Sequence, residues 1–362
     1  MRHLALVSDS LAGGGAERVM ATLANYLARR HRVSFITLFH DLPDRFQLDP
    51  GVERIALQLP GPPTWRGREF PRLTLLNQGL ALGRLWTRLR PDAALTFMET
   101  ANFLGGIASL RTGVPLAISE RCHPKDLVLN RFHKKVYRQL TYRLPRAFIA
   151  QSQATADWAR QFLPKRRIHV LPNPIFAGRP EAVSDQRPVV LSVGRLAQAK
   201  GQPELLEAFA SLASQFPDWK LRLVGEGPLA EELQQRALQP DLLGRVEWAG
   251  WCHDMDAEYR RASVFAHLSH SEGQPNVVLE ALWHGLPCLV SDCFPGCRQF
   301  LKDGQEALVV PIRDGPAARQ GLYELLSRGE LRARLGQRGQ ARVAPLGVNR
   351  CGLLWEELLL SL

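Results

Sequence analysis

The sequence of 362 residues contains no long apolar run. A helix that spans a membrane needs about 20 consecutive apolar residues, and nothing close to that length occurs here. We therefore expect no membrane-spanning helix. The apolar part of the N-terminus, residues 3–8, is too short for a signal peptide, and its pattern predicts a first strand.

Cysteine is also scarce, and its spacing excludes two classes of small stabilised domain. The six Cys form no disulfide framework. Cys288, Cys293 and Cys297 cluster, but no paired C-x2-C occurs and no His follows at the spacing of a zinc site. We expect reduced thiols, no metal site and a cytoplasmic location. No repeat of 20–50 residues and no low-complexity segment is present, which excludes a repeat protein.

Basic residues are abundant, but their excess over acidic residues is confined to the first half of the chain. Residues 1–172 hold 26 Lys+Arg against 12 Asp+Glu, while the remainder holds 20 against 23. The entire excess of +11 therefore lies in the first half. Such a field attracts an anionic partner, which is either a membrane surface or a nucleic acid. No base-stacking module or recognition helix is present, so we expect no nucleic acid partner.

Strand-like runs alternate with helical patterns along the chain, which predicts an α/β fold with parallel, doubly wound sheets. The length exceeds what one hydrophobic core usually holds, so two domains are expected. The proline-rich stretch Leu171–Ile175 predicts a linker between them. We predict domains at 1–172 and 173–345, followed by a C-terminal segment, 346–362, in which the one-sided apolar pattern of Cys351–Leu362 predicts a helix.

The stretch Ser271–Leu282 carries the strongest functional signal. A strand-like run precedes it, a Gly/Pro turn follows, and apolar residues at helical spacing begin after Pro275. The start of a helix exposes backbone N–H groups that bind phosphate. Glu272 and Glu280 bracket that start, and carboxylates bind sugar hydroxyls well. This arrangement suits a nucleotide-sugar.

This stretch resembles the signature E-G-x-P-N-V-x-L-E-A-L of the retaining glycosyltransferases of family 4, which have the GT-B fold. Further motifs of that family follow the same order over nearly the whole chain, namely G-G-A-E-R at residues 14–18, R-x-x-x-x-K-G at 195–201 and G-x-G-P at 225–228. The resemblance implies two Rossmann-like domains facing an inter-domain cleft, the first binding the acceptor and the second the nucleotide-sugar. It also implies that the C-terminal helix crosses back and packs on the first domain.

The resemblance also implies roles for single residues. Arg195 and Lys200 would hold the donor diphosphate and stabilise its developing charge, so that neither a metal nor a cofactor is required. Glu272 would bind donor-sugar hydroxyls and Glu280 the ribose. The residues of the nucleotide-sugar site would be Gly14, Gly15, Gly194, Arg195, Lys200, Gly225, Cys252, Glu272, Gly273, Pro275, Asn276, Val277, Val278 and Glu280.

Glu120, in Ser119-Glu120-Arg121, follows a predicted strand at the place where family members carry an acceptor-side acid or His. We predict that Glu120 acts in catalysis or positions the acceptor; the structural alternative is a helix cap or a surface ion pair. The predicted catalytic residues are therefore Glu272, Arg195, Lys200 and Glu120.

Two basic, aromatic segments of the first half are typical of helices that lie in a membrane interface. One is Leu59–Arg90, which contains Trp65 and Phe70, and the other runs from Arg131 to Arg143. They predict docking on an anionic membrane leaflet, which places the protein at the inner face of the cell membrane. The alternative is that they are solvated faces of helices packed on the sheet.

The resemblance thus predicts a hexosyltransferase that works with retention, by front-face substitution, and forms an α-linkage. UDP is the expected carrier from its frequency in the family, and the acceptor is a glycan or a lipid-linked saccharide. Another GT-B enzyme such as a sugar-nucleotide 2-epimerase, a non-catalytic nucleotide-sugar sensor and a basic nucleic-acid-binding protein are the alternatives. The sugar, the acceptor and the linkage position are not specified by the sequence.

Overall fold

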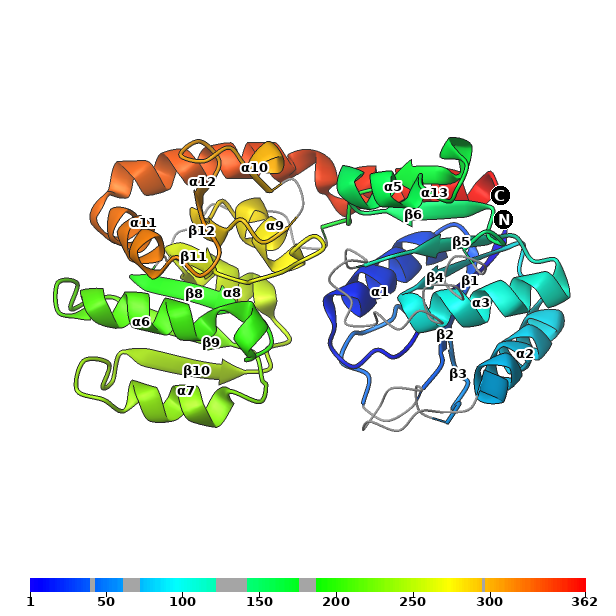
Figure 1. Cartoon of the computed structure of the whole chain (residues 1–362), viewed down its shortest axis with the longest axis horizontal. Coiled ribbons are helices and arrows are strands. Elements are labelled where there is room, and N and C mark those ends of the chain that lie inside the picture. Colours follow the sequence, from blue (N-terminus) through cyan, green and yellow to red (C-terminus); the bar gives the residue numbers. More distant parts are fainter. Residues whose placement is uncertain (40–42, 61–71, 122–141, 176–186, 295–296) are drawn as a thin grey trace. The chain divides into compact units, whose positions relative to one another are not determined.

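The structure is a computed structural model, and it describes residues 1–39, 43–60, 72–121, 142–175, 187–294 and 297–362. The chain divides into two compact units (Figure 1). Unit 1 comprises Met1–Pro174 together with Leu346–Leu362, and unit 2 comprises Ile175–Pro345. The predicted linker position, 172/173, lies two residues before the observed division, and the second division falls between 345 and 346.

The described part of unit 1 contains a seven-stranded parallel sheet in the order β3-β2-β1-β4-β5-β6-β7. The strands are β1 (His3–Ser8), β2 (Arg32–Thr37), β3 (Val52–Ala56), β4 (Ala93–Phe97), β5 (Leu116–Ser119), β6 (Ala147–Ala150) and β7 (Ile168–Val170). The helices are α1 (Gly15–Ala28), α2 (Arg72–Leu89), α3 (Glu99–Thr112), α5 (Gln153–Ala159) and α13 (Val348–Leu360). Strand β7 was not predicted, because its three residues are too few for an apolar pattern to stand out.

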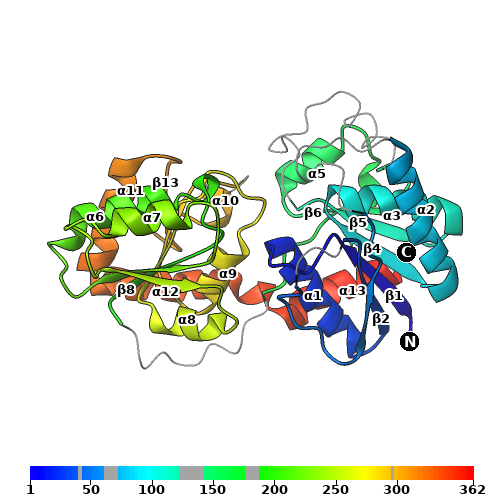
Figure 2. The same cartoon turned by 90° about the horizontal axis from the view of Figure 1, so that it is seen from below.

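Alternation of side chains along β1 produces two cores, one on each face of the sheet. Leu4 and Leu6 belong to the core that also contains buried residues of α1 and α13. Ala5 and Val7 belong to the core that contains buried residues of α2, α3 and α5. Figure 2 shows α1 and α13 together on one side of this sheet and α2 and α3 on the other. Apolar side chains cover both faces of the sheet, as expected for a parallel sheet packed between two layers of helices.

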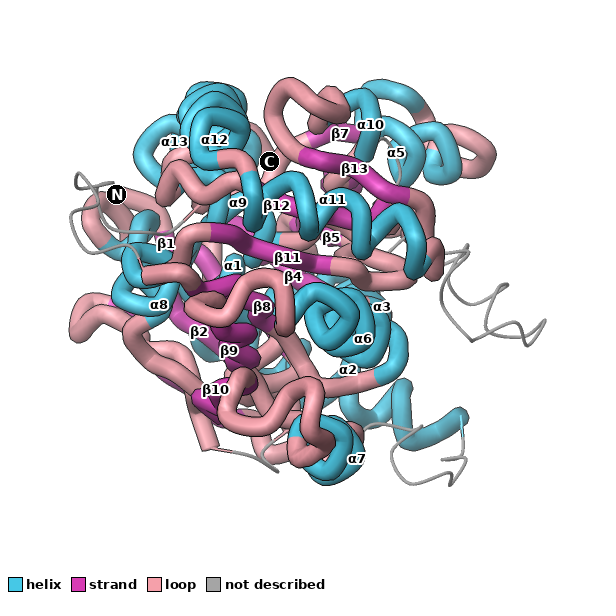
Figure 3. Tube along the Cα trace, turned by 90° about the vertical axis from the view of Figure 1, so that its left-hand side faces the viewer, coloured by secondary structure: helices cyan, strands magenta, loops and turns pink. Residues whose placement is uncertain are grey.

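Unit 2 repeats this architecture, with a six-stranded parallel sheet of order β10-β9-β8-β11-β12-β13 in its described residues. The strands are β8 (Val189–Val193), β9 (Lys220–Val224), β10 (Val246–Gly250), β11 (Val264–His267), β12 (Cys288–Ser291) and β13 (Leu308–Val310). The helices are α6 (Gln202–Ala213), α7 (Ala230–Ala237), α8 (Met255–Arg261), α9 (Asn276–Trp283), α10 (Cys297–Phe300), α11 (Gly315–Ser327) and α12 (Gly329–Val343). The central neighbours β8 and β11 lie side by side (Figure 3). Their carboxyl ends are where a doubly wound sheet binds its ligand.

The described residues bear on the expectations for the cysteines and for membrane-spanning helices. The five cysteines among them, Cys252, Cys288, Cys293, Cys297 and Cys351, are free thiols. None of the helices in these ranges is long and apolar enough to cross a membrane.

The helix α2 uses its apolar face for packing inside unit 1. Leu82, Leu85 and Trp86 are buried in the core, while Arg84 and Arg88 are exposed. In the described part of this segment the helix therefore follows the alternative of a solvated basic face. Among the aromatic residues on which the membrane prediction rests, Trp65, Phe70, Phe132 and Tyr137 lie outside the described residues, whereas Tyr142 is buried in the core of unit 1.

The C-terminal helix α13 belongs to unit 1 and is fixed there by polar as well as apolar contacts. Trp355 is fully buried, and its indole Nε1 donates a hydrogen bond of 3.0 Å to the carbonyl of Pro172. The buried carboxylate of Glu356 accepts hydrogen bonds from Tyr26 Oη at 3.2 Å and Arg30 Nη1 at 2.9 Å, and it lies 2.9 Å from His31 Nε2. The helix begins three residues before its predicted start at Cys351.

Trp355→Ala should destabilise the protein strongly, because it removes a large side chain from the core of unit 1. Such truncations cost about 3–5 kcal/mol. Leu354→Ala on the same helix is the matched control, since Leu354 is 44% exposed and surface substitutions change stability by about 0.5 kcal/mol at most. Urea unfolding measures both variants, and equal stabilities would contradict the role assigned to Trp355.

Candidate functional site

The predicted donor residues of unit 2 gather at the carboxyl ends of β8 and β11. The loop after β8 carries Gly194 and Arg195 and ends in the short helix η3 (Gln198–Lys200). The loop after β11 carries Glu272 and leads to α9, which begins at Asn276. Because β8 and β11 are parallel neighbours, both loops leave the same edge of the sheet.

Lys200 and Glu272 form an ion pair across these loops. Lys200 Nζ lies 2.5 Å from Glu272 Oε1, and the same oxygen lies 3.1 Å from His267 Nε2. The Glu272 and His267 side chains are 15% and 3% exposed, so this contact is largely shielded from water. Burial by itself raises the pKa of Glu272, but the hydrogen bond from His267 and the charge of Lys200 outweigh it and lower that pKa to about 2. Glu272 is therefore a carboxylate at neutral pH.

The prediction for Lys200 is thereby refined. Lys200 contacts the predicted sugar-binding carboxylate directly, while Arg195, the other predicted diphosphate ligand, has an exposed side chain. Lys200 thus compensates the charge of Glu272, and Arg195 is directed toward solvent. The sequence motif alone does not separate these two environments.

The start of α9 has the predicted strand, turn and helix order. Gly273 and Pro275 lie in the turn, and Pro275 is the residue before the first helical residue, Asn276. The backbone N–H of Val278 donates to the carbonyl of Pro275 at 3.1 Å. Of the predicted backbone ligands Asn276, Val277 and Val278, the last therefore already has a hydrogen bond within the turn.

Glu280, the predicted ribose ligand, is 4% exposed. Its Oε2 accepts a hydrogen bond of 2.9 Å from the hydroxyl of Tyr259 in α8. The two predicted carboxylates thus have partners of different chemistry: cationic or ring nitrogens for Glu272, and a neutral phenol for Glu280. His267 and Tyr259 were not predicted. For His267, the available signal was a polar residue at the carboxyl end of the apolar run Val264–His267.

Gly194 and Gly225 allow the turns after β8 and β9 to touch. A Cβ at Gly225 would lie 2.0 Å from the carbonyl oxygen of Gly194, and Gly225 has φ of +133°. Gly225 also donates its N–H to Gly250 at the end of β10, at 2.7 Å. Any side chain at position 225 would therefore push these loops apart.

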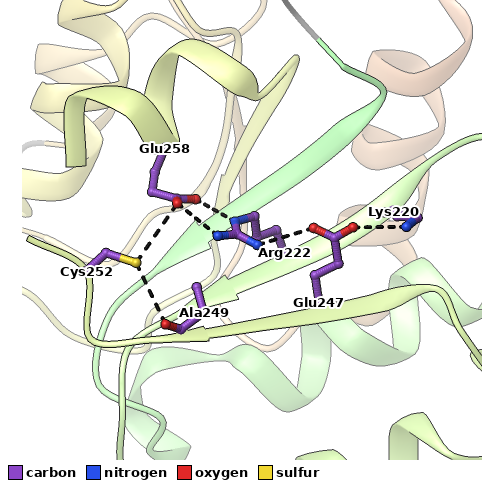
Figure 4. Close-up of polar contacts among 6 residues, drawn as sticks. All are labelled: Lys220, Arg222, Glu247, Ala249, Cys252 and Glu258. Carbon is purple, nitrogen blue, oxygen red and sulfur yellow. Dashed lines mark hydrogen bonds and ion pairs between the residues drawn. The ribbon is translucent and has the colours of Figure 1, made fainter. Parts of the chain in front are cut away.

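Cys252, predicted to lie beside the nucleotide base, is half-buried next to an ionic cluster (Figure 4). Its Sγ lies 3.8 Å from the carbonyl of Ala249 and 3.9 Å from Glu258 Oε1. Arg222 binds Glu258 through two nitrogens at 2.5 and 2.8 Å and also reaches Glu247. Burial, with a smaller contribution from Glu258, raises the pKa of the Cys252 thiol, so that it is protonated at neutral pH. The cluster fixes the loop after β10 to α8.

In unit 1 the amides of the glycine loop bind a side chain of the same chain. The carboxylate Oε2 of Glu17 accepts the backbone N–H groups of Gly13 at 2.9 Å and Gly14 at 2.7 Å, and Oε1 accepts the hydroxyl of Ser10. Gly14 is the N-cap of α1, whose first helical residue is Gly15. Gly14 is a predicted residue of the nucleotide-sugar site, and a ligand that bound its amide would have to displace Glu17.

Asp9, at the end of β1, adds a second acidic group to this loop and was not predicted as a site residue. Burial, together with the charges of Glu17 and Glu99, raises the pKa of Asp9 to about 7, and a hydrogen bond from the Ala101 amide opposes this rise. Its Oδ1 is buried without a hydrogen-bond partner among the described residues. This end of the unit 1 sheet is therefore acidic, although the unit as a whole is basic.

Glu120, the predicted acceptor-side acid, is 3% exposed and accepts a hydrogen bond from the hydroxyl of Tyr142. Burial, followed by the charge of Glu120, raises the pKa of Tyr142 well above its usual range. Asn102 links this pair to Thr96, whose hydroxyl donates to the Asn102 side chain at 2.7 Å. Glu120 is thus part of a buried polar network within unit 1, and neither a solvent-exposed ion pair nor a surface cap describes it.

Two family models match consecutive parts of the chain. The model described as Glycosyltransferase Family 4 matches residues 13–179, and the model described as Glycosyl transferases group 1 matches residues 178–342. Together they span nearly the whole chain, and their junction lies close to the division between the two units.

Curated relatives match over most of their length. The chain is 25% identical over 99% of its length, and 98% of the relative, to the Campylobacter jejuni protein named GalNAc-alpha-(1->4)-GalNAc-alpha-(1->3)-diNAcBac-PP-undecaprenol alpha-1,4-N-acetyl-D-galactosaminyltransferase. It is 29% identical to the lipopolysaccharide core biosynthesis glycosyltransferase LpsE of Rhizobium meliloti, over 90% of this chain and 89% of the relative.

The fold is similar to that of solved structures over its full length. The crystal structure of Anabaena HepE in complex with UDP matches with a TM-score of 0.80 and 20% sequence identity, covering 100% of both chains. The two parallel sheets with helices on both faces are the two Rossmann-like domains of the GT-B fold. The chain therefore belongs to the glycosyltransferases, with the Family 4 domain in its first half and the group 1 domain in its second.

Proposed function

We propose that the protein is a retaining glycosyltransferase that moves a hexosyl group from a UDP-sugar to a glycan or lipid-linked saccharide and forms an α-linkage. The observation that carries this proposal is the group of Lys200, Glu272 and His267 beside the start of α9, in the unit matched by the group 1 model. The names of the relatives support the acceptor class and the α-linkage, and the UDP in the HepE structure supports the carrier.

In this proposal the second unit binds the donor. Arg195 and the amides at the start of α9 hold the diphosphate, and Lys200 stabilises the charge that develops on it as the bond to the anomeric carbon breaks. Glu272 accepts hydrogen bonds from the hydroxyls of the donor sugar, and Glu280 binds the ribose. The acceptor oxygen bonds to the same face of the anomeric carbon, and its proton passes to the departing phosphate. No carboxylate serves as a covalent nucleophile.

The first unit then binds the acceptor, with Glu120 and the glycine loop as its proposed contacts. The acidic surroundings of that loop favour neutral hydroxyl groups over phosphate, because Asp9, Glu17 and Glu99 lie close together there. We further propose that the basic segments of this unit dock on the anionic inner leaflet of the cell membrane, where a lipid-linked acceptor is held.

Transfer should proceed in EDTA at the same rate as with magnesium, since Arg195 and Lys200 supply the charge that a metal would otherwise provide. A panel of UDP-sugars and lipid-linked saccharides identifies the pair that reacts, and proton NMR of the product gives its anomeric configuration. A β-linked product formed from a UDP-α-sugar would overturn the proposed retention. Activity that is lost in EDTA and restored by magnesium or manganese would overturn the metal-independent mechanism.

His267→Leu should introduce a new acid limb into the pH profile of kcat/KM. Without the hydrogen bond from His267, burial has more weight, so the pKa of Glu272 should rise from about 2 toward or above its ordinary value of 4.5. Activity that needs ionised Glu272 is then lost as the pH falls through this higher pKa, while the wild type stays flat there. His267→Gln retains an N–H donor and should restore part of the profile. His253→Leu, at an exposed histidine, is the control. Identical profiles for all variants would remove His267 from this role.

The protein should float with anionic liposomes, much less with neutral ones, and less at high salt because salt screens surface charge. Charge reversal at Lys134, Lys135 and Arg138 should reduce flotation, since each basic residue near an anionic surface contributes about 1 kcal/mol. Charge reversal at Arg328, Arg334 and Arg338, which are exposed in unit 2, is the matched control and should have no effect. Wild-type protein that never floats would end the membrane proposal and leave the transferase proposal intact.

A further inference from the structure

The contact between Tyr259 and Glu280 joins two helices that follow different strands of unit 2. Tyr259 lies in α8, which precedes β11, and Glu280 lies in α9, which follows β11. The phenol donates a hydrogen bond of 2.9 Å to Glu280 Oε2. Tyr259 is 1% exposed and Glu280 is 4% exposed. A buried carboxylate is stable only when its oxygens are hydrogen-bonded, so this contact fixes the carboxylate as well as joining the helices.

The ring of Tyr259 is itself held on two sides. His284, at the end of α9, stacks on it with a centroid distance of 5.0 Å and an interplanar angle of 25°. Phe265 of β11 lies 6.0 Å away at 57°. His284 is in turn held by a contact of its Nδ1 with the Glu280 carbonyl at 2.8 Å, and its Nε2 lies 3.2 Å from Asp256 without forming a hydrogen bond among the described residues. The hydroxyl of Tyr259 therefore has little freedom to move away from Glu280.

We propose that Tyr259 is a positioning residue that orients the Glu280 carboxylate toward the two vicinal hydroxyls of the nucleotide ribose and so makes the donor site selective for ribonucleotides. The inference rests on the proposed function, in which Glu280 binds the ribose. A carboxylate can accept from two adjacent hydroxyls only in one range of orientations, because both donors must align with its lone pairs. A carboxylate that is oriented beforehand binds them without the cost of ordering.

The test compares two ligands on each protein. Calorimetry measures the affinity of the full-length protein for UDP and for 2′,3′-dideoxyuridine diphosphate, which lacks both hydroxyls. Wild type should prefer UDP by at least about tenfold. Tyr259→Phe, which keeps the ring and its stacking, should lose most of that preference by weakening UDP alone. Tyr323→Phe, at a tyrosine that is 41% exposed, is the control and should behave as wild type.

The ratio of the two affinities is measured on the same preparation, so a partial loss of folded protein cancels. Glu280→Ala should abolish the preference, and adding Tyr259→Phe to it should change nothing further, because the two residues act through one contact. If Tyr259→Phe keeps the wild-type ratio while Glu280→Ala loses it, the inference is wrong and the ribose role of Glu280 stands. If Tyr259→Phe weakens both ligands equally, Tyr259 is only structural. If Glu280→Ala keeps the ratio, the proposed ribose role fails first.

Discussion

The proposed donor site of unit 2 depends on the close contact between the loops that follow β8 and β11. Gly201, with φ of +67°, approaches so near that a Cβ on it would lie 2.0 Å from the carbonyl oxygen of Leu268. Ala199 accepts hydrogen bonds from the amide of His270 at 2.8 Å and from the hydroxyl of Ser269 at 2.9 Å. These contacts bring Lys200 and Glu272 together, although 72 residues separate them in the sequence. A side chain at position 201 would separate the loops and, with them, the ion pair.

The two units share an architecture but treat their glycine loops differently. In unit 2, Gly194 and Gly225 pack against each other, and the cations Arg195 and Lys200 come shortly after Gly194 in the sequence. In unit 1 the amides of Gly13 and Gly14 bind Glu17 of the same chain. Glycine-rich turns after the first strand of a Rossmann-like domain often bind phosphate, but a carboxylate in that position repels it. The sequence motif is compatible with both outcomes, and the side chain three residues after the N-cap decides between them.

Much of the fold could be predicted from the sequence, because parallel strands buried on both faces are apolar throughout. The apolar runs at 93–97, 116–119, 147–150 and 220–224 form β4, β5, β6 and β9. Short strands such as β7 carry too little pattern, and helix ends such as that of α13 depend on tertiary contacts. At the site, the motif residues Lys200 and Glu272 could be paired only through the structure. His267, the partner of Glu272, ends an apolar strand, and Tyr259, the partner of Glu280, lies in the mostly charged segment Met255–Arg261, so neither residue belongs to a recognisable motif.

The different partners of Glu272 and Glu280 suit the distance at which each carboxylate would lie from the diphosphate in the proposed site. A diphosphate bound near α9 repels an uncompensated carboxylate by about 3 kcal/mol per charge pair at about 5 Å and an effective dielectric constant of about 20. Glu272 lies in the loop just before that helix, and its charge is compensated by Lys200 at 2.5 Å. Glu280 lies further along the helix, where repulsion is weaker, and the neutral hydroxyl of Tyr259 is one of its partners. In the proposed function, the residue types at these four positions would thus allow two carboxylates and a diphosphate to share one site.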